Sequence, residues 1–116
     1  MAFNLAVQLY PETLRTLAYG SISGTYARIG SAFANPIKLL VLQNETDVLL
    51  TFSWDGINDH LVLPSMGQIV LDVGSNMSTA AGELYFGQGK SIYVSGDPGS
   101  GSVYLSVFYG LGASNT

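Results

Sequence analysis

Closely spaced turn signals divide this sequence into short pieces, and this limits the possible folds more than any other feature. Glycine allows a positive φ, proline fixes φ, and the side chains of asparagine and aspartate bond to nearby backbone. Such residues cluster at positions 20–21, 35–36, 44–47, 55–56, 64–67, 74–76, 87–89 and 96–101. The intervals leave little room for a long helix, so short strands are the expected elements.

The runs between these turns are rich in Val, Ile, Leu, Tyr, Phe and Thr, most of which favour a pleated sheet. We predict strands at residues 13–19, 24–29, 37–43, 48–54, 60–63, 68–73, 83–86, 91–95 and 102–109. The first run also has apolar residues at helical spacing, but Gly20 ends it early. Segments 37–43 and 48–54 are expected to pair as a hairpin over the turn at 44–47.

Seven to nine short antiparallel strands, about eight, and no predicted helix indicate an all-β fold. The expected architecture is an antiparallel β-sandwich with a jelly-roll-like topology. A length of 116 residues suits one domain, and no repeat or linker divides the chain, so we expect a single domain over residues 1–116. The small and polar residues 112–116 are expected to be flexible.

The composition is apolar for a chain of this kind. Charged residues make up 10% of the sequence, where about 25% is usual, and the mean hydropathy is +0.32. A membrane-spanning helix needs about 20 consecutive apolar residues, whereas the longest apolar run here is residues 39–42. The first ten residues lack the basic region of a signal peptide. We therefore expect no membrane partner and assign the surplus apolar surface to protein contacts.

The charges and the missing cysteine exclude other classes of protein. The net charge is −4, and the four basic residues are scattered at Arg15, Arg28, Lys38 and Lys90. Nucleic acid binding needs a basic patch, so we expect no nucleic acid partner. Without cysteine, thiol catalysis and cysteine-ligated metal sites are impossible.

Several predicted strands are apolar on both faces, although a strand in a small sandwich has only one interior to face. In segment 102–109, Val103, Leu105 and Val107 alternate with Tyr104 and Phe108.

The same pattern recurs earlier in the chain. In segment 37–43, Leu40 and Leu42 face one side of the strand, and Ile37, Leu39 and Val41 face the other. In segment 48–54, Leu49 faces the side opposite to Leu50 and Phe52. The second faces are predicted to contact other chains, since exposed apolar patches mark interaction sites and interfaces favour aromatic residues. The interface candidates are Tyr104, Phe108, Leu40, Leu42 and Leu49, with a second copy of the chain as partner. Two alternatives remain open: loops of the same chain cover these faces, or the other face is the interior.

Motifs that suggest catalysis or metal binding fail on spacing. The sequence Gly-Lys-Ser at 89–91 lacks the upstream glycine of a phosphate-binding loop, because position 84 is leucine, and a strand is predicted to follow. His60 and Asp59 are neighbours on a strand and point to opposite faces, which suits a catalytic triad poorly. The acidic loop 55–59 lacks calcium-loop spacing.

Two further patterns involve carboxylates and an aromatic residue. Glu12, Glu45 and Glu83 lie in no segment that resembles a cleft for glycoside hydrolysis. Trp54 could form a sugar-stacking platform, but it lies two residues after Phe52 and therefore on the same face of the predicted strand, which favours a position in the core. We therefore predict no enzyme, no catalytic residue, no metal and no cofactor.

Several segments stand in a distinctive order along the chain, namely LRTLAYGSISGTY at 14–26, NPI at 35–37, NETD at 44–47, SWDG at 53–56, DH at 59–60, LP at 63–64 and GSVYLSVFYG at 101–110. This order resembles small virion structural proteins of tailed bacteriophages. The resemblance implies a jelly-roll accessory subunit in many symmetric copies, which decorates or cements the capsid or sits at the neck or tail. It also implies a virion location and major capsid, neck or tail proteins as partners. A receptor- or carbohydrate-binding module of a phage tail is the alternative.

Overall fold

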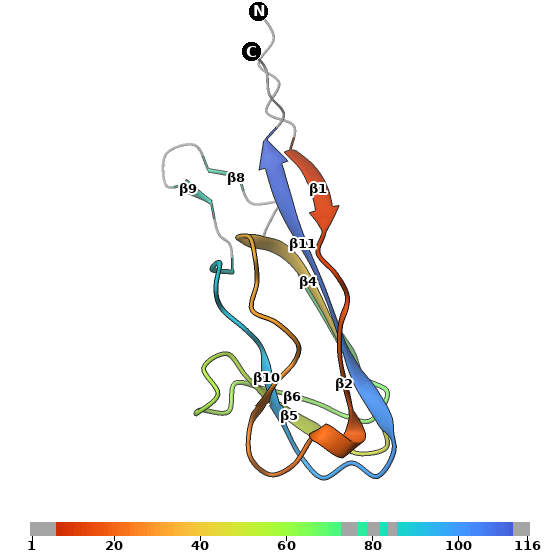
Figure 1. The fold of residues 1–116 in the computed structure, drawn as a ribbon. Helices are drawn as coiled ribbons and strands as arrows, with labels where there is room; N and C mark the ends of the chain where they lie inside the picture. Colours follow the sequence, from red (N-terminus) through yellow and green to blue (C-terminus); the bar gives the residue numbers. More distant parts are fainter. Residues whose placement is uncertain (1–6, 73–76, 79–81, 84–85, 113–116) are drawn as a thin grey trace, which may run out of the picture.

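The computed structural model describes residues 7–72, 77–78, 82–83 and 86–112, which form two large antiparallel sheets and one small two-stranded sheet (Figure 1). The first sheet contains β1 (Val7–Pro11), β2 (Arg15–Ala18), β11 (Gly101–Gly112), β4 (Ile37–Thr46) and β7 (Gln68–Asp72). The second sheet contains β3 (Ala27–Arg28), β10 (Tyr93–Ser95), β5 (Leu50–Ser53) and β6 (Leu61–Leu63). A short 3-10 turn, η1 (Tyr19–Ser21), follows β2, and β8 (Met77–Ser78) pairs with β9 (Gly82–Glu83).

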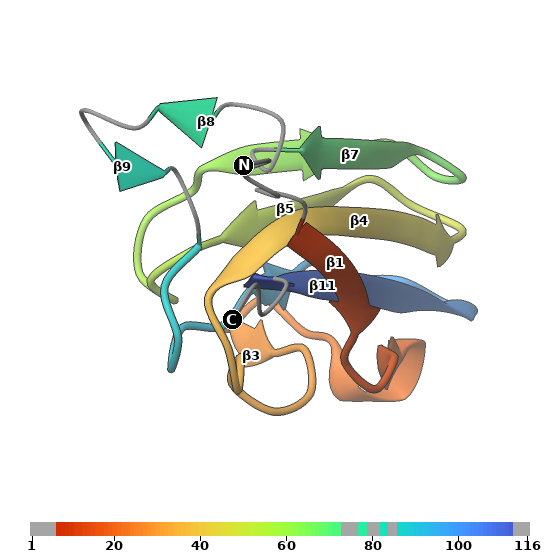
Figure 2. The same ribbon diagram turned by 90° about the horizontal axis from the view of Figure 1, so that it is seen from above.

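The strand order defines a jelly roll. The first sheet runs β1–β11–β4–β7, with β2 also beside β11, and the second runs β3–β10–β5–β6. The chain crosses between the two sheets after β2, β3, β4, β6 and β10, and also on the way from β7 to β10, so that it winds around the sandwich as two Greek keys. Figure 2 shows β7, β4 and β11 side by side from above. The predicted fold class, an all-β antiparallel jelly-roll sandwich, is confirmed.

The predicted hairpin over residues 44–47 is wrong. β4 continues to Thr46 and lies inside the first sheet, where β11 and β7 occupy its two edges. No edge of β4 is left for β5, which pairs instead with β10 and β6 in the opposite sheet. β4 ends at Thr46 and not at residue 43, so the chain turns later than predicted, and it uses this turn to change sheets.

A buried side chain holds this crossing together. Asn44 is fully buried, and its amide nitrogen donates to the carbonyl oxygens of Val48 at 2.9 Å and Leu63 at 3.0 Å. Its Oδ1 accepts a hydrogen bond of 2.6 Å from the Thr46 hydroxyl. Because buried polar groups need such partners, Asn44 fixes where the chain leaves one sheet for the other.

The core fills the space between the sheets, and it corrects one expectation about β4. Leu40 and Leu42 are 0% exposed, so the prediction that they face outward is wrong. The register steps from Phe108 opposite Leu39 to Tyr109 opposite Ile37, which makes Lys38 an extra residue in β4. Such a bulge shifts the alternation, so Ile37 and Leu40 both point inward.

The other predicted strands agree with the structure to different degrees. Strands β2, β3, β5, β6, β7, β10 and β11 lie within or overlap the predicted segments. In segment 83–86, Glu83 belongs to β9 and Phe86 forms an isolated bridge to Ile37, whereas residues 84–85 lie outside the described part. Residue 73 and the tail 113–116 also lie outside it, and Gly112 ends β11. β1 was not predicted at all.

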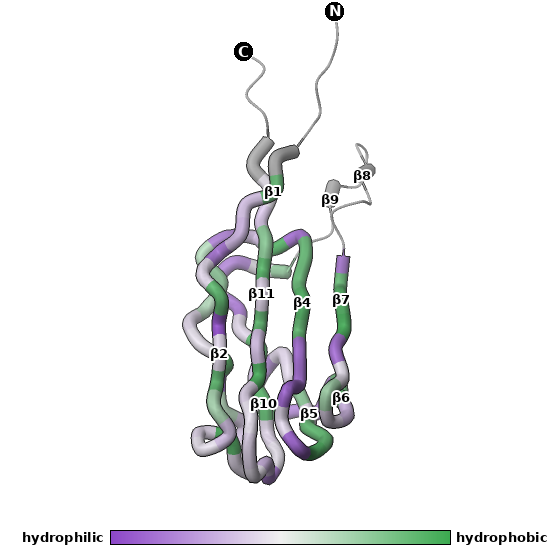
Figure 3. The backbone as a smooth tube through the Cα atoms, turned by 90° about the vertical axis from the view of Figure 1, so that its right-hand side faces the viewer, coloured by the Kyte–Doolittle hydropathy of each residue, from purple (hydrophilic) through white to green (hydrophobic). Residues whose placement is uncertain are grey.

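β1 and the end of β11 form a two-stranded ribbon at one end of the sandwich (Figures 1 and 3). The pairing of β4 with β11 ends at Ile37 opposite Tyr109, so the last residues of β11 pair with β1 alone. At the base of the ribbon, the rings of Tyr10 and Tyr109 stack with centroids 5.7 Å apart. The ribbon thus leaves the sandwich at this tyrosine pair.

Candidate interaction surface

The outer face of the first sheet is apolar at the end nearest the ribbon. Directly opposite residues of paired strands share a face, and the register places Pro11, Phe108 and Leu39 in one row, which ends at the exposed Asp72 of β7. Val41 and Val70 form a second row. We call this surface the apolar outer patch, and it consists of Leu9, Pro11, Leu39, Val41, Val70 and Phe108.

The exposure of the patch shows that the sandwich does not cover it. Leu9 is 47% exposed and Val70 is 52% exposed, while Leu39, Val41 and Phe108 are half-buried. The core lies on the opposite side of the same strands, where Val107 is 0% exposed. Three neighbouring strands and β1 therefore present apolar side chains outward within the described residues.

The other half of this face is polar. Tyr104 lies opposite Thr16 on one side and Gln43 on the other, and the Gln43 amide donates to the Gln68 side chain at 3.3 Å. Figure 3 looks onto this sheet and shows β4 changing from hydrophobic near the ribbon to hydrophilic near its far end. The face is thus divided along its strands, and the apolar outer patch has a definite border.

The five interface candidates from the sequence lie in three different places. Tyr104 and Phe108 are half-buried on the outer face, Phe108 within the patch and Tyr104 on its polar half. Leu49 is 55% exposed but belongs to the turn between β4 and β5, outside the patch. Leu40 and Leu42 lie in the core.

Four members of the patch were missed because two structural features were not foreseen. Leu9 and Pro11 belong to β1, which has too few β-branched residues and too little sequence context to be recognised. Leu39 and Val41 were assigned to the same face as Ile37, and only the bulge reverses them. The alternation of Val70 with Ile69 and Leu71 would have indicated an outward residue.

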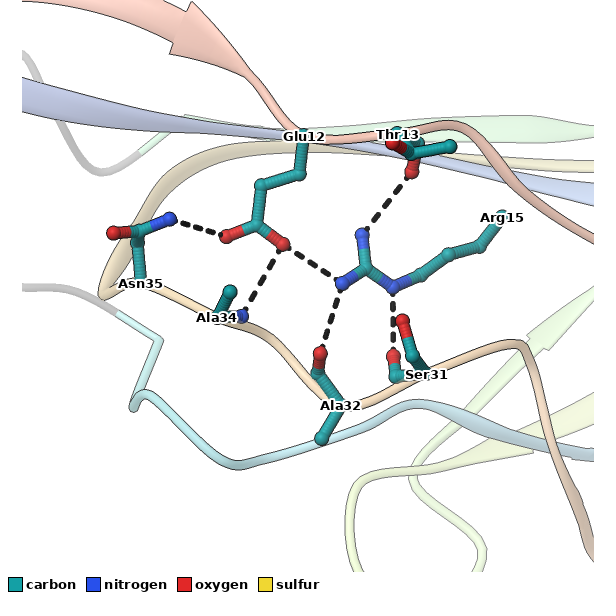
Figure 4. Close-up of polar contacts among 7 residues, drawn as sticks. All are labelled: Glu12, Thr13, Arg15, Ser31, Ala32, Ala34 and Asn35. Carbon is teal, nitrogen blue, oxygen red and sulfur yellow. Dashed lines mark hydrogen bonds and ion pairs between the residues drawn. The ribbon is translucent and has the colours of Figure 1, made fainter.

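A buried ion pair fixes the position of β1 and β2 beside β11 (Figure 4). Arg15 is 6% exposed, and its guanidinium lies 2.7 Å from the Glu12 carboxylate. The guanidinium also donates to the carbonyl oxygens of Ser31 at 2.7 Å and Ala32 at 2.9 Å. Arg15 further stacks above the Phe33 ring, 5.4 Å from its centroid. This network, the Glu12–Arg15 clamp, ties the β1–β2 connection to the loop before β4.

The hydrogen-bond partners of the Glu12 carboxylate determine its pKa. Burial alone would raise the pKa of the Glu12 carboxyl, but hydrogen bonds from Asn35, Arg15 and the Ala34 amide outweigh it. The pKa therefore lies below its ordinary value of 4.5. A carboxyl whose pKa is lowered by folding stabilises the folded state above its unfolded pKa, and that stability is lost as the pH falls through the folded pKa.

Glu12→Gln is accordingly expected to lower the free energy of unfolding at pH 7 by about 1–3 kcal/mol, because the charged hydrogen bonds to Arg15 weaken. The difference in the free energy of unfolding between Glu12→Gln and the wild type should become smaller as the pH falls below 4.5, where the wild-type carboxyl takes up a proton. Urea unfolding at a series of pH values measures this. A difference that stays constant between pH 7 and pH 3 would contradict the assignment.

The residues singled out for catalysis serve the backbone or one another. The His60 Nδ1 accepts a hydrogen bond of 2.9 Å from the Trp54 amide, and the Asp59 carboxylate accepts one from the Tyr26 hydroxyl. Asp55 accepts hydrogen bonds from the amides of Ile57 and Asn58, both at 2.8 Å, and hydrogen bonds from Asn58 and Ile57 lower the pKa of its carboxyl well below the usual range. His60 and Asp55 thus bond to the backbone of their own turns, whereas Asp59 bonds to the Tyr26 side chain.

The remaining candidates follow the same pattern. The Lys90 amide donates to the Gly87 carbonyl at 3.2 Å in a turn that leads into β10, and no helix follows. Trp54 is partly buried against the core, with its ring 6.4 Å from Phe86. Glu45 lies in β4, while Glu83 is placed only by its backbone in β9.

The described residues hold neither a metal-binding cluster nor a membrane-spanning helix. Within this part of the chain, no three His, Asp or Glu side chains gather where they could hold a metal ion. Among the same residues, no helix has the length and apolar character that crossing a membrane requires.

The fold and the surface together define a jelly-roll protein with an exposed apolar sheet face. No family model matches the chain, and no curated protein matches it in sequence. One solved chain, from work on Bacillus endospore appendages described as a novel family of disulfide-linked pili, shares 10% sequence identity with a TM-score of 0.48. The match covers 96% of each chain.

Proposed function

We propose that this chain is a non-enzymatic structural subunit of a bacteriophage virion that self-associates and binds neighbouring proteins. It decorates or cements the capsid, or sits at the neck or tail, next to the major capsid, neck or tail proteins. The observation that carries the self-association is the apolar outer patch, which six residues from four strands present outward. The virion placement is supported by the resemblance in segment order and by the jelly roll, an architecture that viral capsid proteins use.

The patch supports protein contacts because of what surrounds it. Large apolar areas on a soluble protein mark interaction sites, and a polar rim is the usual border of a protein interface. Here Tyr104, Gln43 and Gln68 form that border on one side. Phe108 lies between Pro11 and Leu39, in the position of a central aromatic anchor.

Phe108→Asp tests the self-association. A carboxylate in the middle of the patch would have to lose its water on association, so we expect the association constant to fall at least about tenfold. Sedimentation velocity over a range of concentrations measures this, and circular dichroism checks that the variant keeps its fold. Thr16→Asp is the matched control, because Thr16 is exposed on the polar half of the same face.

The results separate self-association from virion placement. A wild type that stays monomeric in concentrated solution, or a Phe108→Asp variant that assembles like Thr16→Asp, overturns the self-association. Mass spectrometry of purified phage particles tests the placement, which predicts the chain in many copies per particle. Its absence there removes the virion assignment and leaves the self-association standing.

A further inference from the structure

The ribbon of β1 and β11 has an open side. β1 is the outermost strand of the first sheet, and no strand among the described residues pairs with its outer edge. The inner edge of β1 pairs with β11 from Val7 opposite Gly112 to Pro11 opposite Phe108. The backbone groups of the outer edge are therefore available to a further strand.

The hydrogen bonds of the inner edge determine which groups point outward. The Glu12 amide donates to the Val107 carbonyl at 3.0 Å, immediately after the pair Pro11–Phe108. In an antiparallel ladder, residues alternate between pairs that exchange hydrogen bonds and pairs that do not. Tyr10 consequently turns its amide and carbonyl toward Tyr109, whereas Val7, Leu9 and Pro11 turn theirs outward.

Proline has no amide hydrogen, so Pro11 stands at a position where an edge strand tolerates it. Leu9 and Val7 remain as outward donors, and all three residues offer outward carbonyl oxygens. β1 has the sequence Val-Gln-Leu-Tyr-Pro, so its edge carries one common guard of edge strands, the proline at its end, but no charged residue. A two-stranded ribbon is also only marginally stable by itself in water.

We infer that β1 pairs with β1 of a second copy of this chain, antiparallel and around a two-fold axis at Leu9. The two Leu9 residues then exchange amide-to-carbonyl hydrogen bonds, and each Val7 amide donates to the Pro11 carbonyl of the partner. Pro11 has no amide hydrogen to donate to the Val7 carbonyl of the partner, so each Val7–Pro11 pair contributes one hydrogen bond where two are usual. The first sheets of the two copies become one continuous sheet, and a two-fold contact is the commonest form of self-association.

This inference rests on the proposed function and extends it, since it names a second contact between copies. Leu9 and Pro11 belong both to the paired edge and to the apolar outer patch. Pairing around Leu9 would therefore bring the two patches together on one side of the joined sheet. Like-charge repulsion does not oppose this contact, because β1 carries no charge.

Leu9→Pro and Leu9→Ala test the pairing. Both variants lose the leucine side chain, but only proline also removes the outward amide hydrogen. The hydrogen bonds between β1 and β11 do not use this amide, so Leu9→Pro leaves them intact. We expect Leu9→Pro to associate at least about tenfold more weakly than Leu9→Ala, because the two central hydrogen bonds are lost. Equal association of the two folded variants, measured by sedimentation velocity, would overturn the inference.

Hydrogen exchange in the wild type gives a test that does not depend on a folded variant. We expect the Leu9 amide to be protected in the assembled protein and to exchange quickly in dilute monomer, with the Tyr10 amide as the inner-edge reference. A Leu9 amide that exchanges quickly in the assembled protein overturns the β1 pairing alone. A chain that is monomeric at every concentration removes the proposed self-association and this inference together.

Discussion

Arg15→Met is expected to lower the free energy of unfolding by about 3–5 kcal/mol. Methionine keeps much of the apolar length of arginine, but it leaves the Glu12 carboxylate buried without its cationic partner, which is 2.7 Å away in the wild type. The carbonyl oxygens of Ser31 and Ala32 also lose their donors. Chemical denaturation of the monomeric protein measures the change.

The control for Arg15→Met is the same substitution at an exposed arginine. Arg28→Met in β3 removes an equal charge and should change the free energy of unfolding by at most about 0.5 kcal/mol. Adding Glu12→Gln to Arg15→Met should restore part of the loss, because it removes the unpaired buried charge. If Arg15→Met and Arg28→Met are equally stable, the Glu12–Arg15 clamp does not hold the fold.

Gly101→Ala is expected to destabilise the domain by about 3 kcal/mol or more. Gly101 has a φ of +90°, which an alanine rarely adopts. An added Cβ would also lie 2.1 Å from the Glu45 carbonyl oxygen and 2.8 Å from the Thr46 Cα. Both are backbone atoms of β4 that pair with the start of β11, so neither can move aside without opening the sheet.

Gly89→Ala separates the backbone strain from the steric clash. Gly89 has a φ of +83°, but no atom lies within 4 Å of an added Cβ. This variant should therefore show only the conformational cost, about 1 kcal/mol. The difference between the two variants, measured by thermal or urea unfolding, gives the cost of the clash at Gly101. Equal losses of stability in Gly101→Ala and Gly89→Ala would show that the start of β11 has room for a Cβ at position 101.

The sequence pattern predicted the β-sandwich because its signals were local. Turn residues and β-branched runs report on neighbouring positions, and in β11 the strict alternation separated the buried Val107 from the outward Phe108. The same rule failed for Leu40 and Leu42, since one extra residue at Lys38 reverses the alternation of β4. No neighbouring residue marks that bulge, which arises from pairing with a strand far along the chain.

The surface was predicted less completely than the fold, for related reasons. Arg15 was read as one of several scattered charges, but it is buried, and its partners are carbonyl oxygens of a loop 16 and 17 residues away. Such contacts have no sequence signature. Leu9 and Pro11 were not predicted as surface residues because β1 is recognised as a strand only through its pairing with β11, which the sequence does not reveal.

The position of β11 has a consequence for how the chain is made. β11 lies between β4 on one edge and β1 and β2 on the other, and all three precede it along the chain and emerge from the ribosome before it. Contacts so distant along the chain form late and slowly. The nascent polypeptide therefore keeps these sheet positions unfilled until β11 has been synthesised, and a chain that ends before Gly101 cannot complete its first sheet.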